Sequence, residues 1–116
     1  MVLTETIERD NVKINFILGR NAKDNHDIID NSYPDSLWFH LDNVPSGHCI
    51  LESESGSLVP FDEDIYYAAN LVKSYSKCKN KKNTKVIYCC INNIKKGKSK
   101  GEVIILDINK TKFVIV

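Results

Sequence analysis

Two histidines flank a Pro-Ser-Gly turn in a stretch that is typical of a β-hairpin. His40 and His48 lie in DSLWFHLDNVPSGHCILE (35–52), where two runs of strand-forming residues border the turn. If the turn is centred midway between the two histidines, antiparallel pairing sets them opposite each other, with Cβ atoms about 4.5–5.5 Å apart. Trp38 would then share their face of the sheet, and Phe39 would lie on the other face. We therefore predict a pair of neighbouring imidazoles.

Neighbouring imidazoles can bind a metal, transfer a proton or hold a phosphate, and they can also simply hydrogen-bond to each other and to nearby backbone. A metal needs further ligands, and the sequence offers only His26, four cysteines without a CxxC spacing and scattered carboxylates. Acid–base catalysis needs a positioned nucleophile or water, and no nucleophile-elbow motif is present. The sequence therefore predicts no metal and no cofactor, and it favours binding over catalysis.

A second motif, GRNAKDN (19–25), follows a predicted strand and opens a short helical segment. Gly19 would let the backbone turn sharply, Arg20 offers a planar fork suited to phosphate, and free N–H groups at a helix start favour an anion. The same residues also fit a purely structural interpretation, in which the strand ends and Asn21 caps the helix. The motif alone does not decide between these two interpretations.

The charges are strongly segregated along the chain, although the net charge is only +1. Residues 1–64 hold 13 acidic and 4 basic side chains, whereas residues 65–101 hold 10 lysines and no acid. An A/T-rich coding sequence would scatter lysines without excluding acids from so long a segment. We interpret the segment as a basic surface that meets an anion, most often nucleic acid. Its lysines are Lys73, Lys77, Lys79, Lys81, Lys82, Lys85, Lys95, Lys96, Lys98 and Lys100.

The chain, at 116 residues, is long enough for one modest core, and we predict a single domain over 1–116. No run approaches the ~20 apolar residues of a membrane span, and the N-terminus lacks the pattern of a secretory signal. We therefore expect an intracellular, cytoplasmic protein without a membrane partner. Its cysteines should be reduced, with Cys49 and one of the adjacent Cys89 and Cys90 in the core.

Apolar spacing predicts an α+β fold, with a mainly antiparallel sheet of about six strands, one main helix on one face and a short second helix. The main helix begins with three acidic residues at 62–64, which favour its dipole, and Lys73 and Lys77 fall in its last turns. The expected strands are 13–19, 36–41, 48–52, 85–94, and a terminal hairpin of 102–108 with 112–116; the expected helices are 22–29 and 62–78.

Six segments together resemble the NFACT-R domain family in order and spacing: GRNAKDN, DSLWFH, VPSGHCI, AANLVKSYSK, KVIY and IKKGKSKGEV. This domain is the C-terminal RNA-binding module of the ribosome-quality-control factors of the NEMF/Rqc/RqcH type, and it also occurs alone, as in the coiled-coil-domain-containing protein 25 family. The resemblance runs from about residue 13 to 105, with Pro-Ser-Gly-His (45–48) where the family usually has Pro-Gly-Ser-His. The matching motif positions are Gly19, Arg20, Asn21, Asn25, Trp38, Phe39, His40, Pro45, His48, Ser76 and Lys77.

The resemblance and the lysines together imply a nucleic-acid-binding module for structured RNA such as tRNA or rRNA, linked to translation or ribosome quality control, with the ribosome as a further partner. The ten lysines would contact phosphates, together with Arg20 and Asn21. Arg20, His40 and His48 would form a more specific pocket, with Trp38 or Tyr75 available to stack on a base.

Three alternatives stay open. The first is an RNA- or nucleotide-processing enzyme that uses His40 and His48 as acid and base, with Arg20 on a phosphate. The second is a DNA-binding sensor module, since stand-alone members of the family are associated with DNA. The third is an adaptor whose lysines meet an acidic protein.

Overall fold

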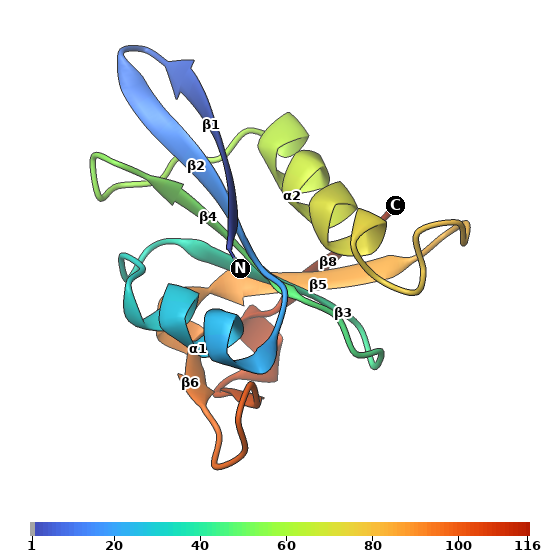
Figure 1. Cartoon of the computed structure of the whole chain (residues 1–116). Coiled ribbons are helices and arrows are strands. Elements are labelled where there is room, and N and C mark those ends of the chain that lie inside the picture. The colour runs from blue at the N-terminus through green and yellow to red at the C-terminus, as the bar shows by residue number, and fades with distance from the viewer. Residues whose placement is uncertain (1) are drawn as a thin grey trace.

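Six antiparallel strands form the main sheet of the protein (Figure 1), and a two-stranded sheet stands apart from it. The computed structural model describes residues 2–116. The main sheet has, in spatial order, β1 (Leu3–Arg9), β2 (Val12–Gly19), β4 (His48–Ser53), β3 (Leu37–Leu41), β5 (Lys85–Cys90) and β8 (Lys112–Ile115). The small sheet pairs β6 (Ile94–Lys96) with β7 (Val103–Ile105). The helices are α1 (Ala22–Asp30), α2 (Asp62–Ser74) and the 3-10 turns η1 (Ile91–Asn93) and η2 (Ile108–Lys110).

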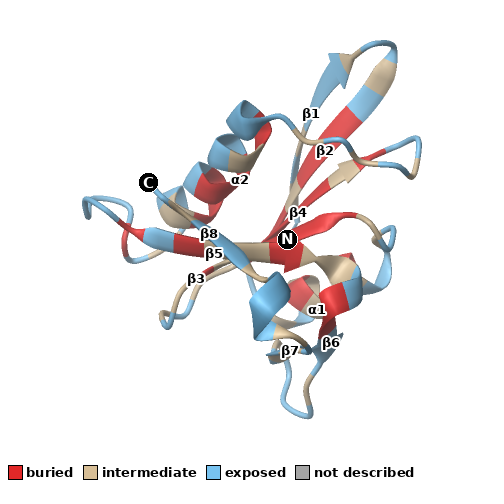
Figure 2. Ribbon diagram, turned by 180° about the vertical axis from the view of Figure 1, so that it is seen from behind, coloured by how far each residue is buried: buried red, intermediate tan, exposed pale blue. Residues whose placement is uncertain are grey.

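One face of the main sheet packs against α2, and together they form the larger core. Side chains that alternate along the central strands point to this face, among them Phe16, Phe39 and Leu51. Ala68 and Val72 of α2 cover them, and Figure 2 shows the buried side of this helix turned toward the sheet. The small alanines let the helix approach the strands closely, so all five side chains are almost fully buried.

The opposite face of the sheet carries a second, smaller core. Trp38, Ile50 and Cys89 point to this face, where they meet Ile28 of α1 and Ile94 of β6. Figure 1 shows α1 and the β6–β7 hairpin on the side of the sheet away from α2. The sheet is therefore covered on both faces, and His40 and His48 share the face of the smaller core because they have the same parity as Trp38 and Ile50.

Most of the predicted architecture is confirmed. The fold is α+β, α2 is the main helix on one face, and α1 is the short second helix. Cys49 and Cys89 are buried, while Cys90 points to the other face and is half-buried. The main helix is shorter than predicted, because it ends at Ser74 and leaves Lys77 beyond it. Neither helix has the length and apolar run needed to cross a membrane, over the residues described.

The prediction of a terminal hairpin is wrong. The segment expected at 102–108 forms β7, which pairs with β6, whereas β8 pairs with β5 at the edge of the main sheet. The amide side chain of Asn93 explains the change of path, because it donates to the carbonyl of Asp107 at 2.9 Å and accepts from its N–H at 3.0 Å. Asp107 then caps η2 through the N–H of Asn109, and the chain turns toward β5.

Two further segments differ from prediction. The expected strand 85–94 ends at Cys90 and continues as η1 and β6. Strand β1 was not predicted, because its sequence LTETIER is too polar to indicate a buried face. Asp10 and Asn11 both have positive φ, as the two-residue turn of a tight hairpin requires, and they join β1 to β2.

Candidate nucleic-acid interface

The hairpin of β3 and β4 has the predicted register. Leu37 pairs with Leu51 and Phe39 with Cys49, which sets His40 opposite His48. The two imidazole rings lie edge to face, with their centroids 5.0 Å apart. The predicted histidine pair is therefore confirmed.

Hydrogen bonds give the two histidines opposite tautomers. Trp38 Nε1 donates to Nδ1 of His48 at 3.2 Å, so neutral His48 carries its proton on Nε2. Nδ1 of His40 lies 2.6 Å from the carbonyl oxygen of Leu41, which can only accept, so neutral His40 carries its proton on Nδ1. The pair thus offers one N–H donor, on His48 Nε2, and one bare nitrogen acceptor, on His40 Nε2.

Burial keeps both imidazoles neutral near pH 7. Desolvation lowers the pKa of His48 to about 3, with a further contribution from His40 and His26. Desolvation also lowers the pKa of His40, although its bond to the Leu41 carbonyl and the charge of Asp42 act in the opposite direction. The pair can therefore act by hydrogen bonding, and it does not supply positive charge for a phosphate.

Trp38 does not have the role that sequence suggested. Its side chain is only 3% exposed, so the indole is not available to stack on a base. It instead stacks on His40, with centroids 5.7 Å apart and an interplanar angle of 17°, and holds His48 by its hydrogen bond. Trp38 thus positions both histidines.

Two glycines and an asparagine lock the N-terminal end of β4 against the end of β2. The buried side chain of Asn25 accepts a hydrogen bond from the backbone N–H of His48 at 3.2 Å. A Cβ on Gly19 would lie 2.5 Å from this Asn25 oxygen, and a Cβ on Gly47 would lie 2.4 Å from the carbonyl oxygen of Gly19. Close approach therefore explains both glycines, and Asn25 is a positioning residue that the charge and turn patterns did not single out.

The GRNAKDN motif caps α1. The side chain of Asn21 accepts a hydrogen bond from the N–H of Asp24 at 2.9 Å, as the structural interpretation predicted. Arg20 is exposed, and its guanidinium carbon lies 5.6 Å from the ring centroid of Tyr75, which is 51% exposed. Arg20 thus lies beside Tyr75 and does not join the two histidines, so the expected pocket of Arg20, His40 and His48 does not form as a unit.

A cavity of about 590 Å³ lies between the histidine pair and the C-terminal part of the chain, a size usual for small-molecule sites. We call it the histidine cavity. Trp38, His40 and His48 form one wall, and Ile105, Ile108 and Phe113 form the other. Residues from β3, β4, β7, η2 and β8 therefore meet here, which no local sequence pattern indicated.

The charged side chains at the histidine cavity are balanced. Asp42 and Glu102 line it together with Lys85 and Lys112. Lys85 Nζ lies 3.6 Å from the Asp42 carboxylate and 4.4 Å from the centroid of the Phe113 ring. The cavity therefore has no excess of positive charge that would select an anion.

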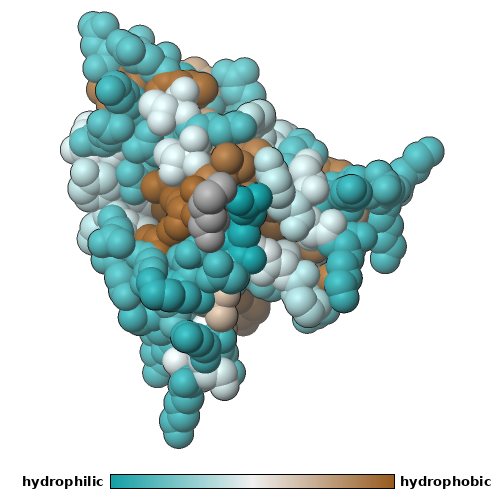
Figure 3. All heavy atoms as spheres, viewed as in Figure 1, coloured by the Kyte–Doolittle hydropathy of each residue, from teal (hydrophilic) through white to brown (hydrophobic). Residues whose placement is uncertain are grey.

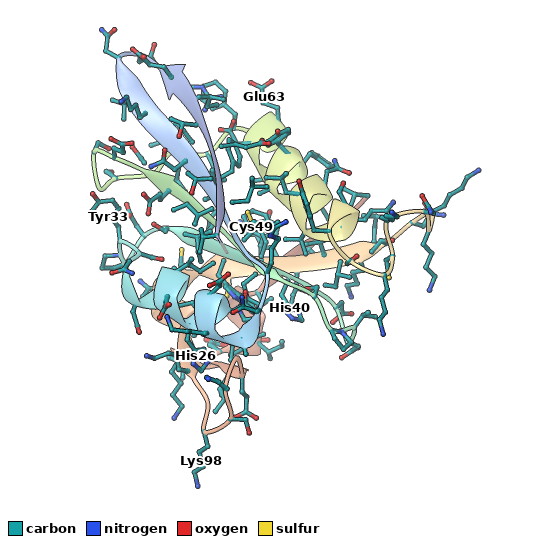
Figure 4. The ribbon with its side chains drawn as sticks, viewed as in Figure 1. His26, Tyr33, His40, Cys49, Glu63 and Lys98 are labelled. Atoms are coloured by element: carbon teal, nitrogen blue, oxygen red, sulfur yellow. The ribbon has the colours of Figure 1, made fainter. Side chains whose placement is uncertain are left out.

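The third histidine ties α1 to the segment that closes the cavity. His26 Nε2 lies 3.0 Å from the backbone carbonyl of Glu102, and Figure 4 shows His26 on the side of α1 that faces the β6–β7 hairpin. Among the described residues, no group of three or more His, Cys, Asp or Glu side chains is arranged to hold a metal ion.

The lysine-rich sequence occupies two projecting segments. One is the loop between α2 and β5 (75–84), and the other is the β6–β7 hairpin (94–105), with Lys98 at its tip in Figure 4. Both tips are hydrophilic in Figure 3, and the β3–β4 turn lies between the two segments in Figures 1 and 2.

Three of the predicted lysines have partners within the chain. Lys73 donates to the carbonyl of Val116, Lys85 pairs with Asp42, and Lys96 pairs with Asp30 at 2.7 Å. The other seven make no ion pair or side-chain hydrogen bond over residues 2–116: Lys77, Lys79, Lys81, Lys82, Lys95, Lys98 and Lys100.

Solved structures include a similar fold. The C-terminal part of the fibronectin/fibrinogen-binding protein from Streptococcus suis superposes with a TM-score of 0.79, covering 96% of this chain and 43% of that one. The two sequences are 23% identical, so this similarity concerns the fold alone.

Sequence comparison identifies the family. Coiled-coil domain-containing protein 25 of Mus musculus is 32% identical over 83 residues, and that of Danio rerio is 30% identical over 83 residues. The alignment covers 68% of this chain in both cases, and it covers 39% of the mouse protein and 40% of the zebrafish protein. The chain thus spans about two fifths of the length of these curated relatives. The family profile matches residues 3–106, from β1 to the end of β7, and the chain belongs to the NFACT protein RNA binding domain family.

Proposed function

We propose that this chain binds structured RNA, such as tRNA or rRNA, through the lysines of the 75–84 loop and the β6–β7 hairpin. The observation that carries the proposal is the set of seven exposed lysines without partners on these two segments, in a stretch of 37 residues that contains no acid. Family membership supports RNA as the general class of ligand. Lysines on two projections suit the phosphates of a folded RNA, because two separate points of contact fix its orientation.

We further propose that this RNA belongs to the translation machinery and that the protein acts in the cytoplasm, in a pathway such as ribosome quality control. The support for this step is the resemblance of the sequence motifs to the RNA-binding module of the quality-control factors. Sedimentation of the purified chain with ribosomal subunits tests it. Co-sedimentation that is lost in the lysine variants described below supports the proposal, and free protein at every ionic strength overturns it.

Fluorescence anisotropy tests the RNA-binding proposal directly. We would titrate the chain into labelled tRNA, duplex RNA and duplex DNA at about 50 and 200 mM salt, because lysine–phosphate contacts weaken steeply over this range. RNA binding that falls by tenfold or more between the two salt concentrations supports the proposal. Equal affinity for duplex DNA indicates a nucleic-acid binder without RNA preference, and no binding at either concentration overturns it.

Charge-reversal variants locate the interface. Lys81→Glu with Lys82→Glu changes the 75–84 loop, and Lys98→Glu with Lys100→Glu changes the β6–β7 hairpin. The matched control is Lys13→Glu with Lys110→Glu, which makes the same change of charge at exposed positions of β2 and η2, outside these two segments. Each loop variant should weaken RNA binding by at least about tenfold and lower the salt dependence. A control that weakens binding equally would show a non-local charge effect and would refute these segments as the interface.

The structure does not favour the catalytic alternative. General acid catalysis near pH 7 needs a group that is partly protonated there, and the pKa of His48 is about 3 while that of His40 is also lowered. We therefore expect no RNA cleavage by the wild-type chain. Cleavage that His48→Gln abolishes while binding survives would replace the binding proposal with an enzymatic one.

A further inference from the structure

The histidine cavity has a hydrogen-bonding character that the lysine loops lack. Trp38 occupies Nδ1 of His48 and the Leu41 carbonyl occupies Nδ1 of His40. This leaves Nε2 of each ring available to the cavity that both histidines line, and neither Nε2 has a hydrogen-bond partner over residues 2–116. His48 is only 3% exposed, and its Nε2–H is not among the fully buried polar atoms, so a ligand or water in the cavity can reach this donor.

The rest of the cavity suits a flat, mostly apolar, uncharged group. Ile105 and Ile108 supply an aliphatic wall, and Phe113 presents an aromatic ring that is 56% exposed. The acids Asp42 and Glu102 offset the two lysines at the cavity, so a phosphate gains little there. The polar end offers one donor beside one acceptor, and the Watson–Crick edge of each nucleobase presents a donor next to an acceptor.

We propose that the histidine cavity takes one unpaired nucleobase of the bound RNA, with His48 Nε2–H and His40 Nε2 on its Watson–Crick edge and Phe113 against its ring. The inference rests on the proposed function, because the lysine loops must first hold the RNA. It assigns the two sets of residues different tasks. The loops bind the backbone of any RNA, and the cavity selects RNA that carries a base outside a helix.

Three fluorescein-labelled RNA hairpins of the same stem sequence test this inference by anisotropy. The first carries a single bulged adenosine, the second carries an abasic nucleotide at the same bulge, and the third is fully paired. We expect the bulged adenosine to bind at least about fivefold tighter than the other two, as one stacked and hydrogen-bonded base would contribute. The abasic hairpin separates recognition of the base from any preference for a flexible stem.

Variants at the cavity rim provide the second arm. Phe113→Ala removes the exposed ring and Ile108→Trp fills the rim, and both positions are exposed enough for the fold to be retained. The matched control is Tyr66→Ala, which removes an aromatic ring of similar exposure from α2. The rim variants should bring the bulged hairpin to the affinity of the paired one and leave the paired hairpin unchanged, while Tyr66→Ala keeps the full preference.

The outcomes separate the two proposals. Equal affinity for the bulged and abasic hairpins, with lysine-dependent binding of both, overturns the nucleobase site and leaves the proposed function intact. No binding of any hairpin overturns the proposed function itself.

Free adenosine that displaces only the bulged hairpin supports a base-sized site, whereas adenosine that binds with micromolar affinity in the absence of RNA shows a nucleoside site and overturns the assignment to RNA. In nitrogen-15 spectra, the Nε2 signals of His40 and His48 should shift when the bulged hairpin is added, and they should not shift with the abasic or the paired hairpin.

Discussion

The indole N–H of Trp38 and the Nδ1 atom of His48 lie 3.2 Å apart in a hydrogen bond between two buried side chains. This contact fixes which nitrogen of His48 carries the proton, and it therefore determines the donor that the histidine cavity presents. A buried residue that touches no ligand can in this way control the chemistry of the site.

Trp38→Phe should allow the proton of neutral His48 to occupy either ring nitrogen. The variant removes the donor and leaves Nδ1 of His48 without its partner, so we expect a loss of at least about 1 kcal/mol in unfolding free energy and a mixture of His48 tautomers. Nitrogen-15 NMR of the ring reports the tautomers, and chemical denaturation reports the stability. Phe39→Leu on the opposite face is the control for lost volume, because it should destabilise the fold without moving the His48 signals. Unchanged signals in Trp38→Phe would show that the indole does not set the tautomer.

The stability of the fold should decrease as the pH falls from 7 to 5. The pKa of His48 is about 3 in the folded chain against 6.5 for a free histidine, so the unfolded chain takes up a proton in this range and the folded chain does not. The free energy of unfolding therefore falls below pH 6.5. Once the pH is well below 6.5, His48 alone makes it fall by about 1.4 kcal/mol per pH unit. The lowered pKa of His40 acts in the same direction.

Urea denaturation at several pH values measures this dependence. His48→Gln keeps a polar side chain that does not titrate, so its stability should change less between pH 7 and 5 than that of the wild type. The pH dependence of stability that remains in His48→Gln is then due to His40. A wild type whose stability is constant over this range would show that the histidines have the same pKa in the folded and the unfolded chain, and would refute the lowered pKa.

Gly47→Ala should destabilise the protein by about 1–3 kcal/mol, because the new methyl group would press on the backbone carbonyl of Gly19, which has little freedom to move. The matched control is Gly97→Ala. Its Cβ would meet the side chain of Glu102, which is exposed and can turn away, so the cost should stay within about 0.5 kcal/mol. Equal stability of the two variants in thermal denaturation would contradict the lock between β2 and β4.

Arg9→Ala should lower the melting temperature by several degrees. Arg9 makes two hydrogen bonds to the carboxylate of Asp64, at 2.5 and 2.8 Å, and Asp64 also accepts from the N–H of Phe61 at the start of α2. The Asp64 side chain is only 3% exposed, so the variant leaves a buried charge without its counter-ion. The deficit should shrink in acid, where Asp64 is protonated in both states.

Glu63→Gln is the control for this ion pair. Glu63 lies 3.5 Å from Arg9, but its side chain is 76% exposed, so its removal should have little effect. A melting temperature that falls equally in both variants would mean that net charge at the first turn of α2, and not the buried pair, is what matters.

The hairpin was predictable because its information is local. Strand residues alternate between faces, and the turn residues lie symmetrically between His40 and His48, so a single register satisfies both. The position of Trp38 on the same face followed from the same alternation. Its burial did not follow, because that depends on α1 and β6 packing over the indole from distant parts of the sequence.

The far wall of the histidine cavity was not predictable for a similar reason. The apolar segments 102–108 and 112–116 fit a simple hairpin, and their spacing contains nothing that opposes one. The paired hydrogen bonds between Asn93 and Asp107 direct the chain from β7 toward the edge of the main sheet. Asparagine and aspartate occur in many loops, so their presence in the sequence did not indicate this contact. The position of Arg20 was not predictable either. An arginine in this motif indicated a contact with an anion, but its place beside Tyr75 depends on where α2 ends, far along the chain.

The two walls of the histidine cavity are also synthesised at different times. The hairpin with both histidines is complete once Ser53 has left the ribosome, whereas Ile105, Ile108 and Phe113 follow later in the chain. Until then the growing chain carries the two histidines without the opposite wall of the cavity. We infer that a nascent chain cannot capture a base through this cavity, and that selective binding begins only when β8 takes its place at the edge of the sheet.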